Sequence, residues 1–99
     1  MKIQETMNGK DLTLVLEGNF DEMTSPMVEK RLEEVFDDDI ESVTFNMRHV
    51  RYISSAGIRV LIIAHKKAMK SGKKVRIGEM SDKVREVIKI VGILPLFSM

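Results

Sequence analysis

Cysteine and tryptophan are absent from this 99-residue chain, and aromatic residues make up only 5% of it. Without cysteine there is no disulfide framework, no thiolate nucleophile and no cysteine-ligated metal site. With so few aromatic side chains, recognition of nucleic acid by base stacking has little to build on. The formal net charge is only +1, which gives no general attraction to nucleic acid or to an anionic membrane.

A long hydrophobic run is also missing. Met1–Thr6 lacks the apolar stretch of a signal peptide, and no segment reaches the roughly 20 apolar residues that span a bilayer. We therefore expect a cytoplasmic protein that binds neither a membrane nor nucleic acid. Hydrophobic residues at 43% and charged residues at 31% are ordinary for a folded chain, and the length fits a single domain over residues 1–99.

The first part of the chain predicts a β-hairpin. A short strand that opens at Ile3 is followed by Met7–Lys10, whose Asn-Gly pair favours a tight turn. Asp11–Glu17 then alternates apolar and polar residues, which indicates a half-buried strand. We expect Gly18–Asp21 to break this strand.

Three later segments have the periodicity of helices. The first follows Ser25, a favoured N-cap residue, and Pro26, which suits the first helical position. We expect this helix to end at Asp37–Asp39. The second follows Gly57 and is apolar on nearly every side, and Ser71–Gly72 stops it.

The third helix is capped by Ser81 and ends at Gly92. Strands are predicted before the second and third helices, at Ser42–Met47 and Lys73–Gly78. The tail Ile93–Met99 is apolar but too short for another capped helix. We expect it to lie extended against the body of the protein.

The predicted order of elements is therefore β-β-α-β-α-β-α, an α/β fold. Strands that alternate with helices imply parallel pairing through right-handed crossovers, after an antiparallel hairpin at the start. We expect a mixed, mainly parallel sheet with helices that cover mostly one face.

No constellation in the sequence predicts catalysis. Ser55 stands between a strand and a helix, but Ile53 occupies the place of the first glycine in the Gly-x-Ser-x-Gly nucleophile elbow. His65 lies about two and a half turns along the helix, too far to act as a base at its start. There is no histidine pair with metal-ligand spacing and no phosphate loop. We expect no enzyme, no metal and no cofactor.

The segment Tyr52–Val60 is the one that points to a function. Two adjacent hydroxyls, Ser54 and Ser55, stand where the second helix begins. The first N–H groups of a helix lack partners inside it, and the partial positive charge there favours a negative group. Either serine could cap the helix, and a cap and a phosphorylation site can be the same residue.

Three segments together resemble the STAS domain family, most closely its small single-domain members, the anti-sigma factor antagonists. Gly18–Asp21 resembles the family's Gly-x-apolar-Asp after the second strand. Asn46–Leu61 resembles its strand-to-helix signature, and Val84–Ile93 resembles its last well-formed helix with a glycine exit. The resemblance spans nearly the whole chain and implies one STAS domain.

In that family the central motif is commonly Asp-Ser-Ser/Thr-Gly, and a partner kinase, itself the anti-sigma factor, phosphorylates the serine after the Asp. By position, Ser55 takes the phosphorylated place, with Ser54 as the alternative. Ser54 itself replaces the Asp, Ala56 replaces the second hydroxyl, and Gly57 matches. A phosphate of about −1.5 to −2 charges is tolerated at a helix N-terminus but would obstruct a partner surface built for a neutral hydroxyl.

The resemblance implies an anti-sigma factor antagonist that works by partner switching. Its unphosphorylated form would bind an anti-sigma factor serine kinase and release a sigma factor, phosphorylation at Ser55 would break the complex, and a phosphatase would restore it. The expected partner surface consists of Asp21, Ser54, Ser55, Gly57, Ile58 and Arg59. We expect a monomer or weak dimer. Two alternatives stay open: a STAS-type scaffold or regulator in another signalling pathway, and a small anion-, nucleotide- or lipid-binding module.

Overall fold

After an initial hairpin, strands and helices alternate along the chain. The computed structural model describes residues 1–36, 39–93, 95 and 97. Its elements are, in chain order, β1 (Lys2–Asn8), β2 (Asp11–Phe20), α1 (Ser25–Phe36), β3 (Ser42–Ile53), α2 (Ser55–Ser71), β4 (Lys74–Met80) and α3 (Asp82–Val91). The predicted α/β class and order of elements are confirmed.

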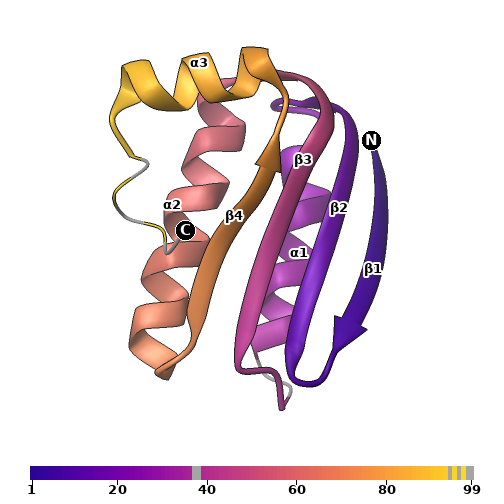
Figure 1. The fold of residues 1–99 in the computed structure, drawn as a ribbon, viewed down its shortest axis with the longest axis vertical. Coiled ribbons are helices and arrows are strands. Elements are labelled where there is room, and N and C mark those ends of the chain that lie inside the picture. Colours follow the sequence, from indigo (N-terminus) through magenta and orange to yellow (C-terminus); the bar gives the residue numbers. More distant parts are fainter. Residues whose placement is uncertain (37–38, 94, 96, 98–99) are drawn as a thin grey trace.

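The strands form one mixed sheet in the order β1-β2-β3-β4 (Figure 1). β1 and β2 are antiparallel, and Gly9 in the turn between them has a φ of 65°, as an Asn-Gly hairpin turn requires. β2 pairs with β3 and β3 with β4 in parallel. The carboxyl ends of these three strands therefore lie at the same edge of the sheet.

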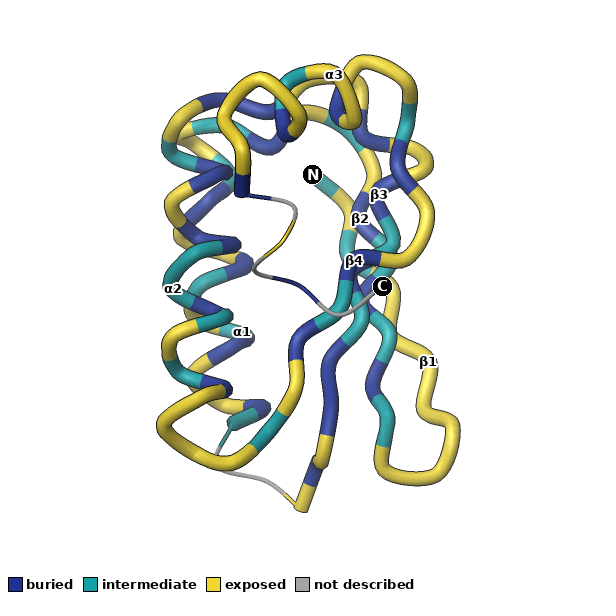
Figure 2. The backbone as a smooth tube through the Cα atoms, turned by 60° about the vertical axis from the view of Figure 1, so that its left-hand side comes forward, coloured by how far each residue is buried: buried dark blue, intermediate teal, exposed yellow. Residues whose placement is uncertain are grey.

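Two helices, α1 and α2, lie together on one face of the sheet, and α3 lies across its end (Figures 1 and 2). β2, β3 and β4 turn apolar side chains toward these helices, in the clearest alternation along β2. The side chains with no exposed surface between the two layers include Leu14, Leu16, Val35, Val43, Phe45 and Leu61. The hydrophobic core is thus on one side of the sheet, as predicted.

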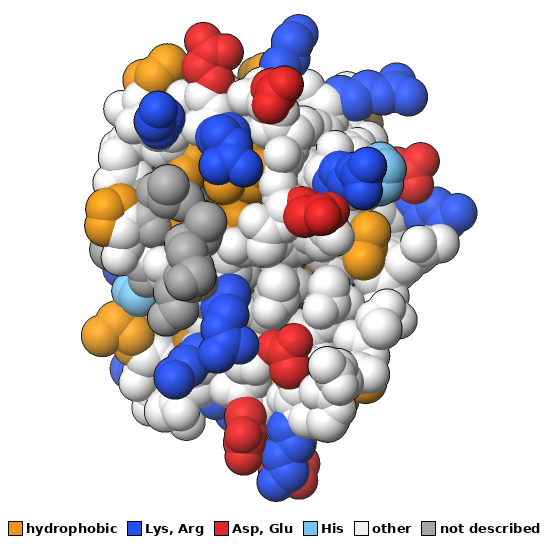
Figure 3. All heavy atoms as spheres, in the orientation of Figure 1, with side chains coloured by type: hydrophobic (Ala, Val, Ile, Leu, Met, Phe, Trp, Pro, Cys, Tyr) orange, Lys and Arg blue, Asp and Glu red, His pale blue; other side chains and the backbone are white. Residues whose placement is uncertain are grey.

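The opposite face of the sheet is not covered by any helix of the described residues. Figure 3 views this face, much of which consists of neutral polar side chains and backbone. Asp11 accepts hydrogen bonds from the hydroxyls of Ser42 and Thr44, and its carboxylate lies 3.7 Å from the Arg76 guanidinium. These contacts link β2, β3 and β4 across the open face.

β2 and β3 extend at least three residues beyond their predicted ends. The predicted break at Gly18–Asp21 is wrong, because β2 continues through Gly18 to Phe20. Gly18 has a φ of 107° within the strand. The register between β2 and β3 shifts twice around this stretch, so the glycine permits an irregularity in a continuous strand. β3 likewise continues past the predicted end at Met47 as far as Ile53.

The turn before α1 also differs from the prediction. Ser25 is the first helical residue and its hydroxyl donates to the carbonyl of Asp21, so it is not the N-cap that the sequence indicates. The Asp21 carboxylate instead accepts hydrogen bonds from the N–H groups of Met23 and Thr24, at 3.0 and 3.2 Å. An aspartate that bonds to the backbone two residues on is a common way to stabilise a turn.

The remaining helix ends agree with local signals in the sequence. Ser81 caps α3, and Gly72 and Gly92 follow α2 and α3 with φ of 69° and 78°. These caps are confirmed. α2 begins at Ser55 after the cap Ser54, one of the two caps that the sequence allows, and its helical residues start before the apolar run that follows Gly57.

Two predictions fall partly outside the described residues. α1 is described to Phe36, and Asp37 and Asp38 lie outside the described residues. The predicted end of the helix at Asp37–Asp39 can therefore be compared only at Asp39, which is not helical. Of the tail, Ile93 and Phe97 are buried. The Phe97 ring lies edge-on to the His65 ring of α2, with 5.7 Å between centroids, so this part of the tail packs against the body.

Candidate functional site

The junction between β3 and α2 lies at the carboxyl edge of the parallel strands. Ser54 has an extended backbone, and its N–H donates to the Phe20 carbonyl at the end of β2, at 2.9 Å. Its hydroxyl accepts a hydrogen bond from the Gly57 N–H at 3.4 Å. Ser54 is therefore the N-cap of α2, and with 5% of its surface exposed its side chain is committed to the fold.

Ser55 has the opposite environment. It is the first residue of α2 and is exposed, and its hydroxyl forms no hydrogen bond with any residue that the structure describes. An enzyme could reach the Ser55 Oγ without opening the start of the helix. The two serines that the sequence leaves as alternatives are thus distinguished by burial and by bonding.

Gly57 and Ile58 belong to the predicted partner surface but are buried. A Cβ at position 57 would lie 2.7 Å from the Phe20 carbonyl oxygen and 2.9 Å from the Ile53 Cγ1, a distance that real side chains do not tolerate. Glycine here allows the first turn of α2 to approach the end of β2. These two residues support the exposed surface from below, and their contact with a partner stays a prediction.

A groove of about 420 Å³ lies beside Ser55, between the starts of α1 and α2. Its walls include Glu22, Ser25 and Glu29 on the α1 side and Ser55, Ala56 and Arg59 on the α2 side. Arg59 is exposed and has no ion-pair partner in the described part of the chain. The groove thus places two carboxylates opposite one free guanidinium, with the accessible hydroxyl on the same wall as the cation.

Asp21 lies at the same edge, in the residue that follows Phe20. It is half-buried, and its Oδ1 is occupied by the N–H groups of the β2–α1 turn. This gives the residue a structural role in holding the turn. Its contact with a partner stays a prediction.

Sequence reasoning missed two exposed apolar side chains at this edge. Met23 in the β2–α1 turn is 88% exposed and Tyr52 near the end of β3 is 54% exposed. The alternation of β3 could have indicated Tyr52, because its neighbour Ile53 points inward. Nothing in the sequence around Met23 separates it from a core methionine. Tyrosine and methionine are residue types that protein interfaces favour.

A larger hollow of about 580 Å³ lies between β3 and the start of α3. Arg48, Arg51 and Lys83 line it together with Glu17 and Asp82, so its charges are mixed. Its serine, Ser81, is already bonded, since its hydroxyl donates to the Val50 carbonyl at 2.7 Å and accepts from the Val84 N–H at 3.3 Å. The groove beside Ser55 is the better candidate because it alone of the two offers an unbonded hydroxyl.

Residues 1–36 and 39–93 together with 95 and 97 contain neither a metal site nor a helix that could span a membrane. Within these residues no group of three histidine, aspartate or glutamate side chains could hold a metal ion. No helix among them is long and apolar enough to cross a membrane.

Comparison with solved structures shows the same architecture in anti-sigma factor antagonists and in a transporter domain. The Bacillus anti-sigma factor antagonist SpoIIAA in its unphosphorylated form superposes with a TM-score of 0.86 at 14% identity, over 98% of this chain and 86% of that one. An anti-sigma factor antagonist from Mycobacterium paratuberculosis gives 0.86 at 18% identity, over 97% and 81%. The STAS domain of a SulP transporter from Vibrio cholerae gives 0.72 at 20% identity, over 94% and 72%.

At these identities the structural likeness concerns the fold. A search of curated protein sequences finds no match. The sequence profile of the STAS domain, however, matches residues 2–99, which is nearly the whole chain. The chain therefore belongs to the STAS domain family.

Proposed function

We propose that this chain is an anti-sigma factor antagonist that acts in the cytoplasm by partner switching. Its unphosphorylated form binds an anti-sigma factor serine kinase, and the captured kinase releases its sigma factor. Phosphorylation of Ser55 ends the complex and a phosphatase restores it. The observation that supports this most strongly is the exposed, unbonded hydroxyl of Ser55 beside the buried cap Ser54.

The chemistry of the switch is a phosphoryl transfer in which this chain is the substrate. The Ser55 Oγ passes its proton to a base of the kinase and forms a bond to the γ-phosphorus of ATP, while the bond to ADP breaks and ADP leaves. The product carries about −1.5 to −2 additional charges at neutral pH. Because the start of α2 favours negative charge, the fold persists, whereas a partner packed against a neutral hydroxyl would have to accommodate a bulky dianion.

The proposed partner surface combines exposed residues with the buried ones that position them. Its exposed side chains are Ser55 and Arg59 in the wall of the groove, with Met23 and Tyr52 from the ends of the neighbouring segments. Ser54, Gly57 and Ile58 hold the start of α2 beneath this surface, and Asp21 holds the neighbouring turn. This divides the predicted set into contacting and supporting members.

Co-purification from the native cell tests the proposal. The unphosphorylated protein should bring down an ATP-binding serine kinase, and mass spectrometry of the free pool should locate phosphate on Ser55. Recovery of unphosphorylated protein with no such kinase would contradict the proposal. Phosphate on Ser54 alone would contradict the assignment of the site.

Variants of the two serines sharpen this test. Ser55→Ala should keep the complex, and Ser55→Asp should weaken it about 100-fold or more, because an unpaired charge buried at an interface costs about 3–5 kcal/mol. Ser54→Ala is the matched control. It should lower the free energy of unfolding by about 1 kcal/mol through loss of the cap, yet leave Ser55 open to phosphorylation.

A second candidate is a STAS-type role in another signalling assembly, which the likeness to a transporter STAS domain supports. In that case the partner recovered from the cell would be a membrane or scaffold protein without a kinase fold. The same co-purification therefore separates the two candidates.

A further inference from the structure

Arg59 follows Ser55 by one helical turn on the same side of α2. Residues four apart on a helix are neighbours. Because helix side chains tilt toward the N-terminus, the long side chain at position 59 can reach back toward position 55. Both residues line the same groove. A group attached to the Ser55 Oγ therefore enters space that the Arg59 guanidinium can reach.

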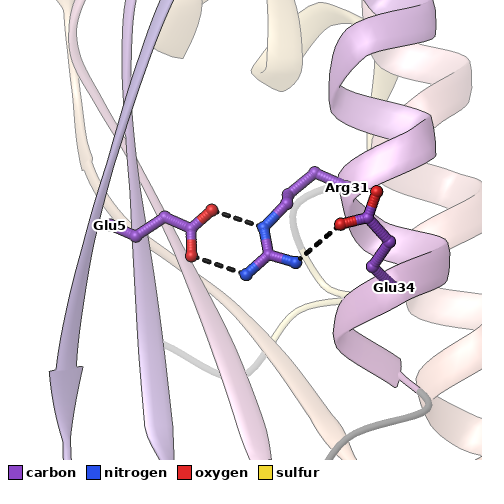
Figure 4. A network of polar contacts seen from close by, with 3 residues as sticks. All are labelled: Glu5, Arg31 and Glu34. Carbon is purple, nitrogen blue, oxygen red and sulfur yellow. Dashed lines mark hydrogen bonds and ion pairs between the residues drawn. The ribbon is translucent and has the colours of Figure 1, made fainter.

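The guanidinium of Arg59 is available for such a group. It forms no ion pair with a described residue, although Glu22 and Glu29 line the same groove. Arg31 of α1 shows the contrasting case: it holds both carboxylate oxygens of Glu5 and also bonds to Glu34 at 3.1 Å (Figure 4). Arg31 is thus committed to the fold, while Arg59 has no anionic partner in the part of the chain that the structure describes.

We propose that Arg59 is the receptor for the phosphate of phosphorylated Ser55, an inference that rests on the proposed function. A phosphate carries more charge than a carboxylate and three acceptor oxygens, and a guanidinium can bind two of them in parallel. An anion placed four residues N-terminal to a cation is also the favoured order for such a helix pair.

The carboxylates of the groove make this receptor necessary. Glu22 and Glu29 share the groove with Ser55 and oppose a dianion there, since like charges in one site disfavour ionisation. Arg59 is the cation in the wall of that groove that offsets them. Without it the phosphate would meet two negative side chains and only the partial charge of the helix start.

Binding of the Ser55 phosphate to Arg59 alters the partner surface in two ways. Phosphorylation adds negative charge at Ser55 and at the same time removes the exposed cation beside it. A partner that pairs an acidic side chain with Arg59 loses that contact and meets the phosphate in its place. The switch can therefore be complete without a change in the fold.

Phosphoserine inserted at position 55 during translation tests this without any kinase. A ³¹P NMR titration of the isolated protein yields the second pKa of the phosphate, ordinarily about 6. Because a nearby cation favours the dianion, Arg59→Gln should raise this pKa by roughly 0.3 unit or more, and Arg59→Lys should recover part of the difference. Arg85→Gln, at an exposed α3 position, is the matched control and should leave it unchanged.

A second readout follows the guanidinium itself. The Nε–H signal of Arg59 should shift on phosphorylation with the same pH midpoint as the phosphate. Equal phosphate pKa values in the parent protein and Arg59→Gln would overturn the receptor proposal, even where the kinase complex exists. Failure to find a kinase would overturn only the proposed function, because the titration needs no partner.

Discussion

Ser54 and Ser55 carry the same hydroxyl, yet one residue of chain separates two environments. Ser54 ends the extended segment after β3, so its hydroxyl folds back to the Gly57 N–H. Ser55 already has helical geometry and is exposed. At the scale of single residues, the site therefore depends on where the helix begins, and Gly57 is the residue that allows it to begin there.

Gly57→Ala should destabilise the protein although alanine is the better helix former. Alanine would gain roughly 1 kcal/mol in helix propensity, but its Cβ would lie 2.7 Å from the Phe20 carbonyl oxygen, and overpacking of this kind costs about 1–3 kcal/mol. Urea unfolding should show a lower free energy of unfolding, and kinase binding should weaken because the start of α2 moves. A gain in stability would refute the close approach of α2 to β2.

At the scale of elements, β1 is the least buried of the strands. It is an edge strand whose residues are exposed except for the half-buried Ile3. The ion pair of Glu5 with Arg31 connects it to α1 (Figure 4). Hydrogen bonds from Arg31 hold the pKa of the Glu5 carboxyl below its ordinary value of 4.5. The stabilisation that this ion pair provides between β1 and α1 therefore depends on pH.

The sign of this dependence follows from the lowered pKa of Glu5. The pair stabilises the folded state fully above the unfolded pKa of 4.5, and the contribution is lost as the pH falls through the lower folded pKa. Arg31 stays charged throughout and adds no pH dependence. Glu5→Gln should cost up to about 1 kcal/mol at pH 7, as for an exposed pair, and less at pH 2, where protonation of Glu5 weakens the pair. Thermal unfolding at both pH values measures this, and a pH-independent difference would contradict it.

At the scale of the whole molecule, the core lies between one face of the sheet and the α1–α2 layer (Figure 2). Phe45 of β3 has no exposed surface and lies in a central strand, flanked by Leu14 of β2 and Ile77 of β4. The other face of the sheet is polar and open. One core therefore supports both helix starts that form the groove.

Phe45→Ala should remove a large part of the total stability. Truncation of a buried phenylalanine costs about 3–5 kcal/mol, and a domain of this kind has about 5–15 kcal/mol in all. Urea unfolding should show the lower midpoint with an unchanged m-value. Thr13→Ala, on the open face of the same sheet, is the control and should cost less than about 1 kcal/mol. Similar losses for both variants would contradict a one-sided core.

The features that were predictable from the sequence depend on neighbours in the chain. The caps at Ser81, Gly72 and Gly92 follow from hydrogen bonds within one helical turn, so residue type alone indicates them. The predicted break at Gly18 failed because pairing of β2 with β3 keeps the chain extended through it. The prediction of Ser25 as the N-cap was wrong, because the Asp21 carboxylate accepts the hydrogen bonds from the backbone N–H groups of this turn.

The sequence by itself determined the order of elements, the one-sided hydrophobic pattern and the presence of two hydroxyls at the start of α2. It did so because periodicity and capping act over a few residues. Only the tertiary structure decided which serine is accessible, and only it brought Glu22 and Glu29 into one groove with Ser55 and Arg59. These residues come from two segments of the chain about 30 positions apart, and their proximity exists only once α1 and α2 pack on the same sheet.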